Sequence, residues 1–109
     1  MDVFDFLEQI QKRPGMHLGE DHDERHKQLL NLSCILYGYE VALSNHQISE
    51  PGVDFTRRFM NYLHDRFGWS RACGPVGAIR LATSTEEEEW ETFWRLLAEF
   101  RASLEAAPR

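Results

Sequence analysis

The sequence predicts an all-α fold, a single compact domain of four to five helices spanning residues 1–109. Apolar residues recur at three- and four-residue steps in several segments, which is the period of an amphipathic helix. No stretch alternates polar and apolar side chains for long enough to form a sheet. The pairs Pro14-Gly15, Pro51-Gly52 and Gly74-Pro75 separate the segments. A chain of 109 residues buries one modest core, which excludes an active site between two large domains.

The first predicted helix covers residues 2–12. Asp2 stands where a helix N-cap is expected, and Phe6 and Ile10 repeat at helical spacing. Pro14 disfavours helical geometry at the residue before it. We therefore expect this helix to end at Arg13.

The second predicted helix covers residues 22–47, and its acidic start suits the positive end of the helix dipole. Apolar side chains surround it on nearly every side, which predicts the central, buried helix. Cys34 is accordingly expected to be a packing residue. Gly38 costs about 1 kcal/mol relative to alanine inside a helix, so we expect another helix to approach closely there.

Two further helices are predicted at residues 54–67 and 86–105. Asp54 is the expected N-cap of the first, which carries an aromatic stripe. Ser84 and Glu87 have the spacing of a capping box for the second. The acidic first turn after Ser84 again suits the helix dipole.

The segment between these helices, residues 68–83, contains three glycines and a proline. This composition predicts a shaped loop, with a short helical turn or strand at Ala78 to Leu81. The residues expected to form the core are Phe6, Ile10, Leu29, Leu32, Leu36, Phe59, Leu63, Trp94 and Leu97.

Charge is distributed unevenly along the chain, whose formal net charge is −6. Acidic residues cluster at Glu20-Asp21-His22-Asp23-Glu24 and at Glu86-Glu87-Glu88-Glu89. An acidic protein is a poor ligand for nucleic acid, because Lys and Arg contacts to phosphate supply most of that affinity. Complementary charge instead favours encounter with a basic protein surface. The same carboxylates also suit helix N-termini and solubility.

The sequence contains no run of about 18 apolar residues, so we expect no transmembrane helix. No apolar secretory run follows the acidic N-terminus. The two cysteines, Cys34 and Cys73, are more simply read as reduced thiols than as a disulfide. Together these features predict a cytoplasmic protein that needs no cofactor.

Two residue sets leave an enzyme open as an alternative. His22 and His26 are four residues apart, a spacing that places zinc ligands on one helix face. No third ligand is fixed by the pattern, and Asp23 stands where the zincin motif needs glutamate. Cys73 lies in a glycine-rich segment, but a cysteine nucleophile also needs a nearby base or helix N-terminus.

Residues 12–19, Lys-Arg-Pro-Gly-Met-His-Leu-Gly, resemble a loop near the start of type II topoisomerase ATPase domains. Such a domain also requires a Glu-x-x-x-Asn helix and an Asp-x-Gly-x-Gly motif. Four residues after Glu40, where the first motif requires asparagine, the sequence has Ser44, and the second motif is absent. We therefore expect no ATPase activity, and we interpret the loop as a shared turn, with Pro14 fixing φ.

A second resemblance covers most of the chain. Its motifs are the loop at residues 12–19, the pair Gly38-Tyr39, Phe67-Gly68-Trp69-Ser70 and an acidic, aromatic C-terminal helix. In these motifs the chain resembles small bacterial immunity proteins, the partners of secreted toxins. The resemblance implies a protein-binding function and identifies neither a catalytic residue nor the toxin.

We therefore expect an immunity protein that neutralises a toxin with a basic surface by masking its active site. Trp69 and Tyr37 are the possible anchors of the interface. The carboxylates expected to bind the partner are those of Glu20, Asp21, Asp23, Glu24, Glu86, Glu87, Glu88 and Glu89. A homo-oligomeric scaffold and a small enzyme remain as alternatives.

Overall fold

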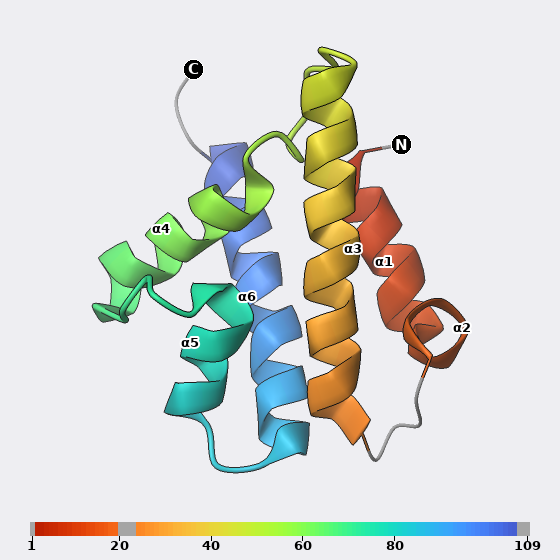
Figure 1. Ribbon diagram of the computed structural model, residues 1–109. Helices are drawn as coiled ribbons and strands as arrows, with labels where there is room; N and C mark the ends of the chain where they lie inside the picture. Colours follow the sequence, from red (N-terminus) through yellow and green to blue (C-terminus); the bar gives the residue numbers. More distant parts are fainter. Residues whose placement is uncertain (1, 20–23, 107–109) are drawn as a thin grey trace.

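The computed structural model describes residues 2–19 and 24–106 and is all-helical. This part of the chain forms six helices, whereas four to five were expected (Figure 1). In chain order they are α1 (Val3–Lys12), α2 (Pro14–Leu18), α3 (Arg25–Asn45), α4 (Phe55–Phe67), α5 (Gly74–Ala82) and α6 (Glu86–Ala106).

The short helices α2 and α5 account for the difference in helix number. Each carries a proline in its first two positions, where the missing N–H costs no helical hydrogen bond. Pro14 therefore ends α1 and at the same time begins α2. The segment at residues 68–83, expected to be mainly loop, contains the nine-residue helix α5.

Helices α3 and α6 lie side by side through the middle of the molecule (Figure 1). On one side lie α1 and α2, with α2 packed against α3. On the other side α5 packs on both α4 and α6. The starts of α3 and α6 lie at the same end, so the first turns of both helices form one surface.

One apolar core joins these helices. Of the residues predicted for it, Ile10, Leu29, Leu32, Leu36, Phe59, Leu63, Trp94 and Leu97 are buried, as expected. Phe6 is only partly buried, and its ring stacks on Tyr39 with 5.5 Å between centroids. Phe55, Phe59 and Phe100 form an aromatic cluster between α4 and α6, and Phe4 extends it to α1.

The helix caps agree with the sequence prediction in one case of three. Asp2 caps α1 in a capping box closed by Asp5. Asp54 precedes α4 in a left-handed conformation (φ 53°) and forms no side-chain cap. The expected box of Ser84 and Glu87 is displaced by one residue. Thr85 Oγ1 accepts from the Glu88 N–H at 3.1 Å, and the Glu88 carboxylate accepts from the N–H of residue 84 at 3.3 Å.

Helix α3 differs most from its prediction. It is not buried on all sides, and an uncharged face that includes Leu30, Tyr37 and Val41 is open to solvent. Cys34, expected to be a packing residue, is exposed. A Cβ atom added at Gly38 would meet nothing within 4 Å, so no helix approaches this glycine. No helix in the described ranges is long and apolar enough to cross a membrane.

Candidate functional site

Two of the acidic segments, Glu24 and Glu86 to Glu89, lie at the end where α3 and α6 begin (Figure 1). Glu86, Glu87 and Glu88 are exposed in the first turn of α6. Glu24 immediately precedes α3, and its carboxylate lies 3.2 Å from Lys27 Nζ. The carboxylates predicted at Glu20, Asp21 and Asp23, like His22, lie outside the described residues.

One ion pair joins the two acidic segments. Arg25 Nε lies 3.8 Å from Glu87 Oε2, and the Arg25 guanidinium stacks 4.1 Å from the centroid of the Trp90 ring. The pair ties the first turn of α3 to that of α6. Residues more than 60 positions apart therefore contribute to one surface, which we call the acidic end.

Glu89 differs from the three glutamates before it. It is only 2% exposed, so it cannot contribute to an interface as expected. Its Oε1 atom lies 2.8 Å from Nδ1 of His26, and Nε2 of His26 contacts Nη1 of Arg80. The helical turn directs Glu89 inwards on the same side as Phe93, four residues later.

Both nitrogens of the His26 ring contact charged side chains. Nδ1 faces the Glu89 carboxylate, which accepts a hydrogen bond, and Nε2 faces the Arg80 guanidinium. Both ring nitrogens are thereby used inside the fold. Among the described residues there is no group of three His, Cys, Asp or Glu side chains placed to hold a metal ion.

The acidic end contains a hollow. A cavity of about 180 Å³ opens beside the buried carboxylate of Glu89. Its other lining residues are Arg80, Thr83, Ser84, Thr85 and Glu86. The lining combines a guanidinium, hydroxyl groups and a carboxylate, which suits a polar or basic side chain rather than an apolar ligand.

Trp69 follows the C-terminal end of α4 and lines a second hollow together with residues of α5. It is half-buried, and its ring stacks on Phe67 at 4.5 Å between centroids. An apolar groove of about 180 Å³ runs from Trp69 to Leu81 and Ala82 at the end of α5. Arg80 lines the polar hollow and the next residue, Leu81, lines this groove, so α5 contributes to two depressions that share no lining residue.

Cys73 also lines the Trp69 groove and is exposed. It is the residue before α5, and a Cβ atom at Gly77 would come within 2.4 Å of the Cys73 Cβ. His64, a candidate base, uses Nδ1 to donate to the Trp69 carbonyl oxygen at 2.8 Å. No described histidine forms a hydrogen bond with Cys73, so the pairing a thiolate nucleophile needs is not assembled.

The exposed face of α3 is the second surface feature and was missed by the sequence analysis, apart from Tyr37. Leu30 is 47% exposed and Tyr37 is 69% exposed. Beside Tyr37 a hollow of about 200 Å³ opens between α3, α4 and α5. The apolar side chains at positions 30, 34, 37 and 41 follow helical spacing, a signal that was visible in the sequence but was assigned to the core.

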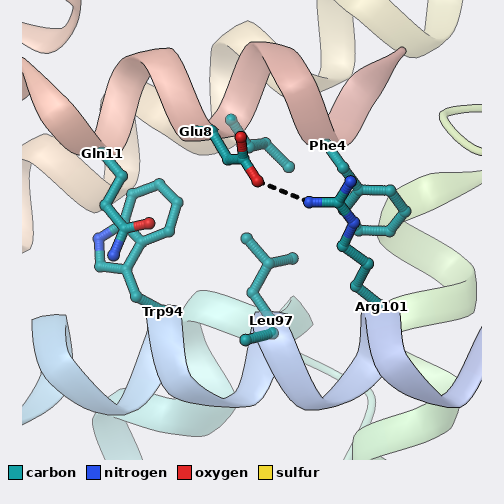
Figure 2. Close-up of a pocket in the computed structure, with 8 residues that line it drawn as sticks. Phe4, Glu8, Gln11, Trp94, Leu97 and Arg101 are labelled. Atoms are coloured by element: carbon teal, nitrogen blue, oxygen red, sulfur yellow. Dashed lines mark hydrogen bonds and ion pairs between the residues drawn. The ribbon is translucent and has the colours of Figure 1, made fainter.

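A smaller hollow of about 100 Å³ lies between α1 and α6 (Figure 2). Phe4 and Leu97 line it, and the ion pair between Glu8 and Arg101, 2.7 Å, closes one end. The buried Nε1 atom of Trp94 finds no acceptor among the described residues. We interpret this hollow as an imperfectly packed seam, because core side chains of both helices form its apolar walls and a surface ion pair spans it.

The chain was compared with protein-family models, with curated proteins and with solved structures, and none of them matched.

Proposed function

We propose that the protein is an inhibitory binding protein of the immunity type, which neutralises a bacterial toxin by masking the toxin's active site. The observation that carries the proposal is the group of exposed carboxylates in the first turn of α6, beside the polar hollow that Glu86 lines. Helix α5 contributes residues both to this hollow and to the Trp69 groove.

The chemistry of this surface fits a partner with a basic cleft. Glu86, Glu87 and Glu88 are exposed, and long-range attraction to a basic surface accelerates encounter. The half-buried Trp69 offers an aromatic anchor at low cost in side-chain entropy. The polar hollow beside Glu86 can receive a lysine or arginine of the partner. In this proposal the protein acts in the bacterial cytoplasm without a cofactor.

The basic residues do not favour nucleic acid as the partner. Each of the five arginines between residues 51 and 85 contacts another polar group within the fold. Arg57 pairs with Asp54 and Arg66 with Glu99. Three others bind neighbouring polar groups: Arg58 the Pro51 carbonyl, Arg71 the Asn61 side chain and Arg80 the His26 ring. Phosphate binding would require these contacts to be exchanged.

The test is affinity capture of the tagged full-length protein from its native host, with bound proteins identified by mass spectrometry. The proposal predicts a stoichiometric toxin polypeptide whose activity falls to background at one equivalent of this protein. A stoichiometric partner whose activity is unaffected would contradict inhibition. Recovery of the protein with no stoichiometric partner would contradict the binding function.

A further inference from the structure

The solvent-facing side of α3 is uncharged over most of its length. From Leu30 to Asn45, a distance of about 22 Å at 1.5 Å per residue, every exposed side chain is uncharged. Those residues are Leu30, Asn31, Cys34, Tyr37, Gly38, Val41, Ala42, Ser44 and Asn45. The nearby Glu40 is turned towards α4, where its carboxylate accepts from the N–H of Thr56 at 2.8 Å and its hydroxyl at 2.6 Å. We call this surface the α3 face.

The fold itself does not require the composition of this face. Gly38 lies in the middle of a 21-residue helix at a cost of about 1 kcal/mol relative to alanine, yet a Cβ atom there would meet nothing within 4 Å. Leu30, Tyr37 and Val41 remain exposed and contribute little to the core. Contiguous exposed apolar side chains of this kind mark interaction sites.

We propose that the α3 face is a dimer interface, on which the α3 helix of a second copy of this chain packs antiparallel. Charge favours this occupant. Two copies with a net charge of −6 each repel one another wherever their carboxylates meet. The exposed positions of α1, α4 and α6 all include charged side chains, whereas those of α3 beyond Lys27 include none.

The sequence of the face is also self-complementary. In the register that places Leu30 of one copy opposite Ala42 of the other, Cys34 lies opposite Gly38. In each of these two pairs the larger side chain faces the smaller one, which allows the two helices to approach closely. The same register brings Lys27 to the carboxyl end of the opposite helix, near Asn45, where the helix dipole is negative.

Tyr37 supplies an anchor for the same arrangement. The hollow of about 200 Å³ beside it is lined by Ser33 and Leu36 of α3, together with residues of α4 and α5. The proposed dimer has a two-fold axis at the middle of the face. This axis places Tyr37 of each copy beside residues 33–37 of the other copy's α3. The hollow opens on the same side. Each copy thus carries both the anchor and the pocket. An isologous interface needs this, because the same surface of both copies takes part.

Light scattering of the full-length protein during size-exclusion chromatography tests the proposal. The wild type is expected at twice the 12.8 kDa chain mass at micromolar concentration. Gly38→Glu places a charge at the centre of the interface in open space, so the variant is expected to fold while its dimer dissociation constant rises at least about tenfold. Ala102→Glu makes a similar change at an exposed position of α6 and is expected to remain dimeric.

The two cysteines provide an independent readout. In the proposed register the two Cys34 residues are offset by only about 6 Å along the helix axes, within reach of a short bifunctional maleimide. Cross-linked dimer is expected for the wild type and for Cys73→Ser, and is expected to be lost in Cys34→Ser. A wild type that is monomeric at about 100 μM, well above typical dissociation constants of dimers, would overturn the proposal. A dimer that survives Gly38→Glu and cross-links without Cys34 would do so as well, because it would use another face.

Discussion

The buried carboxylate of Glu89 accepts a hydrogen bond from Nδ1 of His26, with 2.8 Å between the two atoms. The side chain of Glu89 is 3% exposed and that of His26 is 14% exposed, so neither group is freely hydrated. The contact joins residues 63 positions apart and fixes the first turn of α6 against the first turn of α3. The acidic end keeps its shape because of this buried pair.

Removal of the Glu89 carboxylate is therefore expected to destabilise the protein. Glu89→Leu keeps most of the side-chain volume but leaves the His26 N–H without its acceptor, which costs about 1–3 kcal/mol. Glu86→Leu, in the same helical turn but exposed, is the control and is expected to change the free energy of unfolding by less than about 0.5 kcal/mol. Urea unfolding measures both variants.

A double-mutant cycle separates this contact from simple packing. His26→Leu combined with Glu89→Leu is expected to be less destabilising than the sum of the single changes, because neither polar group is then left unpaired. Additive changes in the free energy of unfolding would show that the two side chains act independently.

The N-terminus of α6 offers a second stability test. Thr85 Oγ1 accepts from the Glu88 N–H at 3.1 Å, so Thr85→Ala removes the cap and is expected to cost about 1 kcal/mol. Ser84→Ala keeps the backbone N–H that donates to Glu88 and is expected to cost little. Thermal unfolding followed by circular dichroism distinguishes the two, and equal losses would argue against Thr85 as the capping residue.

Tyr39 predicts a specific pH dependence. Burial, followed by the hydrogen bond to Glu50, raises the pKa of Tyr39 to about 12 from an ordinary value near 10. Between these two values the unfolded chain loses a proton that the folded protein retains. Stability contributed by the protonated form is therefore complete below about pH 10 and is lost as the pH rises towards 12.

Comparison of two tyrosine variants isolates this effect. Tyr39→Phe removes the group with the raised pKa, whereas Tyr37→Phe changes a ring that is 69% exposed. Urea unfolding at pH 8 and pH 11 is expected to show a smaller alkaline loss of stability for Tyr39→Phe than for Tyr37→Phe. Equal losses in the two variants would show that Tyr39 does not contribute.

The fold class and most of the core were predictable because they depend on helical periodicity. The sequence analysis missed α5 because Gly74, Pro75 and Gly77 are typical of loops. In the structure Pro75 lies in the first turn of the helix, where it is tolerated, and Gly77 gives room to the Cys73 side chain. These reasons depend on contacts that periodicity does not reveal.

The two surfaces were predictable to different degrees. The exposure of Glu86, Glu87 and Glu88 could be predicted from their charge. The burial of Glu89 could be predicted only by working out which side of α6 faces the core. Its spacing to Phe93 and Leu96 was a usable signal, which the run of four glutamates obscured. In α3 both the core face and the exposed face carry large apolar side chains, so periodicity alone does not show which face is buried.

The most direct test of the proposed function is quantitative affinity capture with charge-matched variants. Glu86→Gln combined with Glu87→Gln neutralises exposed carboxylates of the acidic end, and Asp65→Asn combined with Glu105→Gln neutralises the same number elsewhere. The account predicts that the wild type and the second variant retain a stoichiometric toxin polypeptide, and that the first variant retains at least about tenfold less. Equal retention by both variants, or no stoichiometric partner for the wild type, would contradict it.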